Sequence, residues 1–188
     1  MTSDLRDRKA ALRSELLAAR RAVPPEVRAA EAAALRAHVA ALDVRPDQTV
    51  CAFLPVGSEP GDASWLDDLR CRVLLPVVTG DSPLDWAVHT GPDALAPAAL
   101  RLLEPTGPRL GASAIAGASL VLVPALAVSL DGVRLGKGKG HYDRSLSLVT
   151  APLIAVVRDE EVLPSVPAEP HDVRMDGVLT PSGGLRRL

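Results

Sequence analysis

Four short runs of apolar residues constrain the fold of this chain more than any other feature of its sequence. They lie at residues 49–54, 72–78, 120–123 and 153–157. A run of this length, without regular polar positions, is typical of a strand buried on both faces of a parallel sheet. Residues 125–130 continue the third run as a further strand, and residues 84–89 alternate as in a less buried strand. Segments with helical patterning separate the runs, so we predict an α/β fold with a mostly parallel sheet.

Two helices are predicted ahead of the first strand. Leu5, Leu12 and Leu16 recur at helical spacing, and residues 26–42 form an alanine-rich segment with proline at its start. Between the strands we predict helices at residues 63–69 and 142–148, and irregular structure at residues 91–117, apart from one helical turn, and at residues 163–181. No repeat or linker interrupts the sequence, so we expect one domain that spans residues 1–188.

The charge balance and the cysteines exclude several classes of function. The formal net charge is -2, which gives no overall basic field for nucleic acid or an anionic membrane surface. Cys51 and Cys71 have no partners at metal-ligand spacing, and we expect reduced thiols. The charged segment at residues 4–13 differs from a secretion signal, and no run approaches the ~18 apolar residues of a membrane helix. We therefore expect a soluble, cytoplasmic protein without nucleic-acid or membrane partners. A monomer is a separate expectation, because the sequence does not determine the oligomeric state.

The strongest local signal is the glycine segment, DGVRLGKGKGHYDR at residues 131–144. Alternating glycines let the backbone approach a ligand and let successive N–H groups point into one concavity. The segment lies between a predicted strand and a predicted helix, whose N-terminus favours anions. Only three of the 21 lysine and arginine residues are lysines, and two of them are in this segment. The pattern indicates a polyphosphate site, although it is neither a Walker A motif nor G-x-G-x-x-G. A flexible turn with solvated lysines is the alternative.

Several residues elsewhere are candidates for ligand contacts. Asp143 and Asp172 are each able to hold magnesium against phosphates, or to act as cap and turn residues. Glu59 follows the first predicted strand, where α/β proteins bind ligands, and the alternative is a solvated turn. Lys9, Arg13 and Arg20 share a basic edge of the first helix, and the default interpretation of that edge is a solvated helix face.

These motifs resemble those of the 5-formyltetrahydrofolate cyclo-ligase family, also called methenyltetrahydrofolate synthetases. The similarity comprises Lys9-x-x-Leu12-Arg13, Glu104-Pro105, the glycine segment, Leu163-Pro164 and Glu169-Pro170-His171-Asp172, in this order. The resemblance extends from Lys9 to Thr180. It implies a three-layer Rossmann-like fold, shared with ribose-5-phosphate isomerases and CoA transferases. It also implies ATP- and Mg²⁺-dependent conversion of 5-formyltetrahydrofolate, with or without a polyglutamate tail, to 5,10-methenyltetrahydrofolate, ADP and phosphate.

The resemblance also implies roles for individual residues. Asp143 and Asp172 would hold magnesium, and Leu54, Glu59 and Tyr142 would line the folate pocket. Lys139 and Arg144 would be the catalytic side chains. The ATP phosphates would be held by Lys9, Arg13, Arg134, Leu135, Gly136, Lys137, Gly138, Lys139, Gly140, His141 and Tyr142.

Two departures from the family pattern leave alternatives open. His141 stands where the family usually has a first tyrosine, and Ser129 stands near the place of a common aspartate. One alternative is therefore a nucleotide- or folate-binding protein of the same fold that lacks turnover. The other is a sugar-phosphate isomerase or transferase, which would bind phosphate without needing ATP or magnesium.

Overall fold

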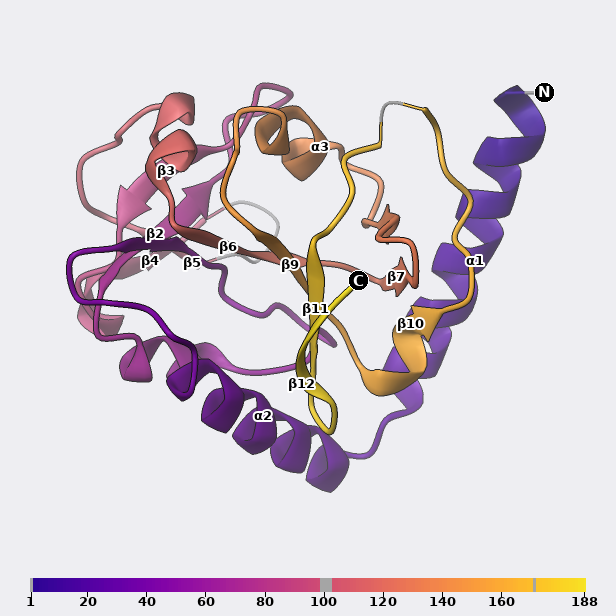
Figure 1. Cartoon of the computed structure of the whole chain (residues 1–188), viewed down its shortest axis with the longest axis horizontal. Coiled ribbons are helices and arrows are strands. Elements are labelled where there is room, and N and C mark those ends of the chain that lie inside the picture. The colour runs from indigo at the N-terminus through magenta and orange to yellow at the C-terminus, as the bar shows by residue number, and fades with distance from the viewer. Residues whose placement is uncertain (1, 99–102, 171) are drawn as a thin grey trace.

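The computed structural model of the chain describes residues 2–98, 103–170 and 172–188 (Figure 1). His171, within the predicted metal motif, lies outside the described residues. The helices are α1 (Thr2–Ala22), α2 (Pro25–Ala40) and α3 (His141–Leu146), with 3-10 helices η1 (Ala63–Asp68), η2 (Pro92–Ala94), η4 (Ala112–Gly117) and η5 (Asp159–Glu161). The strands are β1 (Thr49–Cys51), β2 (Arg72–Val77), β3 (Asp85–Val88), β4 (Leu95–Pro97), β5 (Leu103–Pro105), β6 (Leu120–Pro124), β7 (Ala127–Ser129), β8 (Arg134–Leu135), β9 (Leu153–Val156), β10 (Val162–Leu163), β11 (Gly177–Thr180) and β12 (Gly184–Arg187).

The four apolar runs form the centre of the main sheet. Within the described residues this sheet has the order β12-β11-β9-β6-β1-β2-β3. The strands from β2 to β11 pair in parallel, whereas β3 and β12 pair antiparallel at the two edges. Val50 and Cys51 face opposite sides of β1, and both are fully buried. The predicted α/β fold with a mostly parallel sheet is confirmed.

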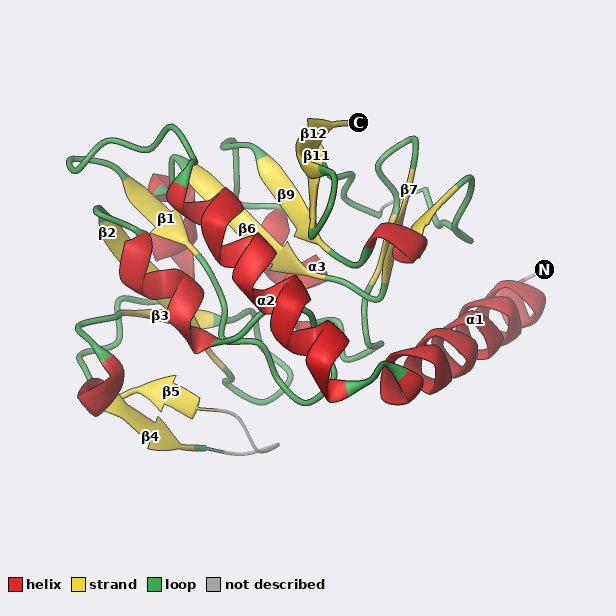
Figure 2. Ribbon diagram, turned by 90° about the horizontal axis from the view of Figure 1, so that it is seen from below, coloured by secondary structure: helices red, strands yellow, loops and turns green. Residues whose placement is uncertain are grey.

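Helical elements cover both faces of the main sheet and make three layers. On one face, Val50 packs in a cluster with Leu35 of α2 and Trp65 of η1. In Figure 2, α2 lies across β1 and β6 on this face. On the other face, Cys51 packs in a cluster with Ile115 of η4. Each large apolar side chain buried in these clusters contributes roughly 1.5–3 kcal/mol to folding.

Helix α1 packs on a separate small sheet. Leu16 of α1 contacts a cluster that includes Leu126, Val133 and Leu135, beside the sheet with the order β10-β7-β8. Figure 1 shows α1 along the side of the molecule that carries β7 and β10. The strand predicted at residues 125–130 is therefore β7, and it belongs to this small sheet, because the chain leaves the main sheet after the proline that ends β6. This packing brings α1 next to the glycine segment.

Two predicted segments differ from the structure. Residues 163–181 were predicted to be irregular, but they include β11, whose four residues are all buried. Gly177 and Thr180 shorten its apolar run to two residues, too few to indicate a strand. Residues 91–117 contain the antiparallel strands β4 and β5 together with η4, whereas the helix predicted at residues 63–69 is present as the 3-10 helix η1. These elements are too short to produce a clear periodicity.

The two cysteines are both free thiols, as predicted. Burial raises the pKa of Cys51 to about 12, so this thiol stays protonated and unreactive. Within the described residues, no helix combines the length and the apolar character needed to cross a lipid bilayer.

Candidate active site

A cavity of about 340 Å³ lies at the carboxyl edge of the parallel strands. We call it the main cavity. Leu54 and Glu59 follow β1, and Pro124 and Ala125 come at the end of β6. Much of its wall is apolar, because side chains such as Phe53, Leu54, Leu75, Leu84 and Leu103 face it. A volume of this size and an apolar lining suit a small organic ligand.

The glycine segment forms the polar wall of the main cavity. Its lining residues are Arg134, Gly136, Lys137, Gly138, Lys139, Gly140, His141, Tyr142 and Asp143. Gly138 and Gly140 have φ values of 89° and 69°, a left-handed conformation that disfavours other residues. These glycines are therefore required by the shape of the loop. The segment is also tied to α1, since Arg13 Nε donates to the Gly136 carbonyl at 2.9 Å.

A second cavity, of about 210 Å³, adjoins the main cavity. The two cavities share Gly138, Gly140 and Asp143 in their linings. The second cavity is strongly charged, and its lining is completed by Arg6, Lys9, Arg13, Glu169 and Asp172. Residues that are far apart in the sequence, and that were predicted to hold phosphates and magnesium, are thus brought together here.

The predicted magnesium ligands face this second cavity and are paired with cations. Asp143 forms an ion pair with Arg134, and Asp172 Oδ2 lies 3.0 Å from Lys9 Nζ. Lys9 Nζ also lies 3.2 Å from a Glu169 carboxylate oxygen. Within the described ranges, no three His, Cys, Asp or Glu side chains are grouped to hold a metal ion. Two carboxylates at one cavity nevertheless fit magnesium, which commonly takes one or two carboxylates together with water and substrate phosphates.

Glu59 and Tyr142 place two polar groups in the main cavity. Glu59 Oε2 accepts a hydrogen bond from the Val56 amide at 2.8 Å, and Oε1 pairs with Lys137 Nζ at 2.7 Å. The Tyr142 hydroxyl is buried and has no hydrogen-bond partner among the described residues. Burial, and then the nearby charge of Glu59, raise the pKa of Tyr142 well above its ordinary value, so the hydroxyl stays neutral. The Arg134 guanidinium lies 5.8 Å from the centre of the Tyr142 ring, within cation–π range.

Three residues of the glycine segment and its approach lie away from the cavity walls. Leu135 is 1% exposed and packs beneath α1, because adjacent residues of a strand face opposite sides. Arg144 lines neither cavity, and its Nη2 donates to the Lys139 carbonyl at 3.2 Å. Ser129 is buried and accepts a hydrogen bond from the Val133 amide at 3.0 Å, which closes the turn at the start of the segment. The presence of Ser129 near the place of the family's common aspartate thus leaves the cavity walls intact.

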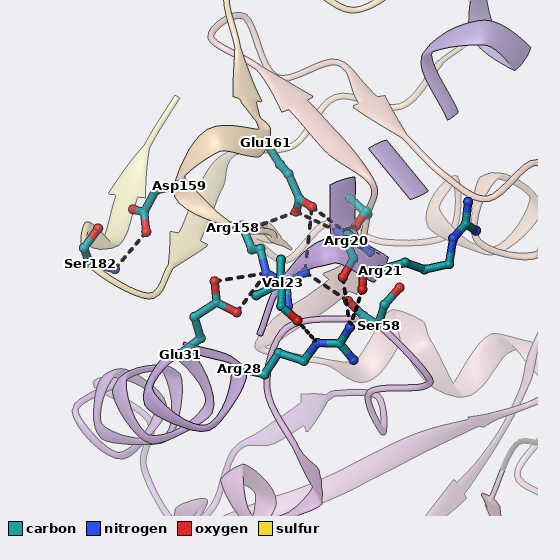
Figure 3. A network of polar contacts seen from close by, with 11 residues as sticks. Arg20, Arg21, Val23, Arg28, Glu31, Ser58, Arg158, Asp159, Glu161 and Ser182 are labelled. Carbon is teal, nitrogen blue, oxygen red and sulfur yellow. Dashed lines mark hydrogen bonds and ion pairs between the residues drawn. The ribbon is translucent and has the colours of Figure 1, made fainter. Parts of the chain in front are cut away.

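The structure also corrects the interpretation of Arg20. This residue was predicted by default to lie on a solvated helix face, but it is 1% exposed. Its guanidinium donates to both carboxylate oxygens of Glu161, at 2.6 and 2.7 Å (Figure 3). Arg6 and Glu169 also line the second cavity, and neither was among the candidate contacts predicted from the sequence. Arg6 belongs to none of the motifs, whereas Glu169 stands in the motif that ends at Asp172 but was given no contact of its own. Tertiary packing brings both residues to the second cavity.

The fold and the site define a class of α/β enzymes in which a basic glycine segment joins an apolar cavity to a charged one. The sequence profile of the 5-formyltetrahydrofolate cyclo-ligase family matches residues 6–181. The chain is also 49% identical to a 5-formyltetrahydrofolate cyclo-ligase of Mycolicibacterium smegmatis, over 96% of this chain and 97% of that protein. The chain belongs to the 5-formyltetrahydrofolate cyclo-ligase family, and it is an enzyme.

Solved structures share its fold. The structure of a 5,10-methenyltetrahydrofolate synthetase from Aquifex aeolicus superposes with a TM-score of 0.78 and 26% identity, covering 96% of this chain and 92% of that one. A 5,10-methenyltetrahydrofolate synthetase from Mycoplasma pneumoniae gives a TM-score of 0.72 at 22% identity, over 90% of this chain and 96% of that one. The second likeness supports the fold alone.

Proposed function

We propose that the chain converts 5-formyltetrahydrofolate to 5,10-methenyltetrahydrofolate, using ATP and magnesium and releasing ADP and phosphate. The observation that carries this proposal is that the two cavities share Gly138, Gly140 and Asp143. The apolar main cavity, with Glu59 at its wall, suits a folate ring system. The charged second cavity suits a polyphosphate with its cation. A shared wall would bring the formyl group and the terminal phosphate together.

The proposed chemistry requires positioning more than covalent catalysis by the protein. A formamide oxygen is a poor leaving group, so the formyl oxygen first takes the γ-phosphoryl group as the bond to ADP breaks. N10 then attacks the formyl carbon, the carbon–oxygen bond to phosphate breaks, and the N10 proton leaves as the ring closes. Preorganised N–H groups and cations can neutralise the charge that develops in such transfers. A protein nucleophile is unnecessary.

We assign the residue roles as follows. The side-chain ammonium of Lys139 makes no hydrogen bond or ion pair with a described residue, so it is available to a phosphate at the main cavity. Arg13 holds the segment and faces the second cavity. Asp143 and Asp172 would hold magnesium, which neutralises phosphate charge. Arg144 supports the Lys139 carbonyl. The folate contacts are assigned to Leu54, Glu59 and Tyr142, and the remaining phosphate contacts to Lys9, Arg134, Gly136, Lys137, Gly138, Gly140 and His141.

We further propose that this activity resides in one domain, residues 1–188, acting as a cytoplasmic monomer. Both cavities are built from a single copy of the chain, so no second copy is needed to complete them. The free thiols of Cys51 and Cys71 suit a reducing compartment. Folates with and without polyglutamate tails would both be substrates.

The test is an absorbance assay for methenyltetrahydrofolate, whose conjugated amidinium absorbs in the near ultraviolet. Purified protein is mixed with 5-formyltetrahydrofolate and magnesium, with and without ATP. We expect growth of the band only with ATP, matched by ADP release and abolished by EDTA. A flat trace from folded protein that binds ATP would instead indicate a non-catalytic binding protein. In that case His141→Tyr would be the first variant to test for restored turnover.

Lys139→Ala tests the phosphate assignment within the same assay. We expect the KM for ATP to rise about tenfold or more, since a hydrogen bond to a charged group contributes about 1.5–3 kcal/mol. The matched control is Arg174→Ala, which removes a cation that pairs with Asp131 at the start of the segment and lines neither cavity. An unchanged ATP dependence in Lys139→Ala would remove this side chain from the phosphate site.

A further inference from the structure

Arg20 contacts a wall of the main cavity from behind. Besides its bond to Glu161, its Nη2 donates to the Ala125 carbonyl at 2.6 Å. Ala125 lines the main cavity. Arg20 lies on the same edge of α1 as Lys9 and Arg13, but it is directed at a different part of the site. The proposed chemistry gives it no role.

Arg158 makes a corresponding contact with the loop that follows β1. Its Nη1 donates to the Ser58 carbonyl at 2.9 Å, directly before Glu59, and its Nε donates to Glu31 of α2 at 2.8 and 3.0 Å. The Arg158 amide donates to Glu161 Oε2 at 2.8 Å. Figure 3 shows Glu161 between the two arginines and Glu31 approaching from α2. We call these four side chains the buried arginine network: Arg20, Arg158, Glu31 and Glu161.

The network is buried more deeply than stability alone explains. The side chains of Arg20 and Arg158 are 1% and 4% exposed. Removing such charges from water has a penalty that often equals or exceeds their mutual attraction, and apolar residues of similar size often stabilise a protein as well. An apolar side chain is, however, unable to donate a hydrogen bond to a backbone carbonyl. The feature that only the arginines supply is the pair of hydrogen bonds to the Ala125 and Ser58 carbonyls.

We propose that Arg20 and Arg158 are positioning residues that fix the two walls of the main cavity relative to each other. Glu161 joins them, so that the wall after β6 and the loop bearing Glu59 are held through one buried carboxylate. The arginines touch no substrate. They act through the Ala125 and Ser58 carbonyls, and their effect on folate use rests on the proposed function.

The test is the double variant Arg20→Met/Glu161→Gln, which removes one positive and one negative buried charge together and leaves no unpaired ion. Methionine cannot replace the hydrogen bond to the buried Ala125 carbonyl, so we expect Tm to fall by about 2–8 °C. The KM for 5-formyltetrahydrofolate should rise about tenfold, and the KM for ATP should be unchanged. This is less than the roughly hundredfold effect of a full 1 Å misplacement. Arg20→Lys keeps the charge but lacks the planar guanidinium, so we expect a KM for 5-formyltetrahydrofolate between those of the wild type and the double variant.

Hydrogen exchange provides a readout that does not depend on activity. The Leu126 and Glu59 amides donate to Leu135 and Val56 carbonyls in the two walls, and both amides should exchange faster in the double variant. The control is Asp159→Asn in the same 3-10 helix. Asp159 holds the β11–β12 turn through Thr180 and Ser182 and contacts neither wall. Its KM for folate and both exchange rates should remain at wild-type values.

The outcomes separate the two proposals. If the double variant keeps the wild-type folate KM and both exchange rates, the positioning role is wrong. If the wild type does not convert 5-formyltetrahydrofolate, the proposed function is wrong, and the exchange rates alone decide whether the network holds the walls. If the double variant does not fold, Arg20→Lys decides, because wild-type KM and exchange in that variant would also refute the role.

Discussion

Replacing Tyr142 with phenylalanine should stabilise the free enzyme and weaken its use of folate. Both effects arise from one atom. The hydroxyl is buried in the wall of the main cavity and has no hydrogen-bond partner among the described residues. In the free protein it has lost its bonds to water without replacement. In the complex, the folate would supply the missing partner.

The magnitudes follow from this geometry. A buried polar group without a partner costs roughly 1–3 kcal/mol. Phenylalanine keeps the ring, its packing in the core and its approach to Arg134 at 5.8 Å. We therefore expect the free energy of unfolding to rise by about 1 kcal/mol, or about 2–4 °C in Tm for a chain of this size. Loss of one hydrogen bond in the complex, about 0.5–1.5 kcal/mol, should raise the KM for folate about two- to twelvefold.

Urea unfolding and the methenyltetrahydrofolate assay measure the two effects separately. Ser145→Ala is a matched control in the same helix, because its hydroxyl is buried but bonded. It accepts from the Leu84 amide and donates to the His141 carbonyl, both at 2.9 Å. Removing this hydroxyl should destabilise the protein by about 1–3 kcal/mol. A loss of stability in Tyr142→Phe similar to that in Ser145→Ala would refute the reasoning, and an unchanged folate KM would remove the hydroxyl from the folate site.

Two more perturbations test the same wall. In the folded protein the pKa of Tyr142 is raised, whereas the tyrosine of an unfolded chain ionises near pH 10. Ionisation therefore favours the unfolded chain, so the free energy of unfolding does not depend on Tyr142 ionisation below about pH 10 and falls as the pH rises above it. Ultraviolet titration of this single tyrosine should show no tyrosinate near its ordinary pKa while the protein stays folded, and an ordinary titration would contradict the burial. Gly138→Ala should cost roughly 1–2 kcal/mol at φ 89° and raise the KM for ATP by pressing on Arg13, 3.4 Å from the added methyl. Gly80 is also at positive φ but has open space around it, so Gly80→Ala should lower stability and leave the KM for ATP unchanged. An equal rise in the KM for ATP in both variants would refute the specific role of the loop.

The sequence indicated those parts of the fold that depend on local pattern. Residues 120–123 and 153–157 are long enough and apolar enough to identify two central strands, and both were correctly assigned. β11 was missed because only Val178 and Leu179 are apolar, and its burial depends on pairing with β9. A four-residue strand between glycine and threonine has no signal that a single sequence can provide.

The same distinction applies to the site. The glycine segment was found from its composition, and the structure places Lys137, Lys139 and Tyr142 at the main cavity. The partner of each charge was not predictable. Glu59 pairs with Lys137 across 78 positions of sequence separation, and Arg20 pairs with Glu161 across 141. Such pairs are set by packing between elements, whereas motif spacing reports only neighbours along the chain.

The basic edge of α1 shows how one local pattern serves three distant contacts. Lys9 meets the carboxylates of the second cavity, Arg13 holds the Gly136 carbonyl, and Arg20 holds the Ala125 carbonyl. At about 1.5 Å per residue these side chains span about 16 Å of one rigid helix. A single phosphate group is too small to engage all three, which is why the pattern alone was ambiguous. Because a helix keeps its length, the same spacing holds the charged cavity and the apolar cavity at a constant separation. A loop carrying the same three cations would bind the same groups without fixing the distance between them.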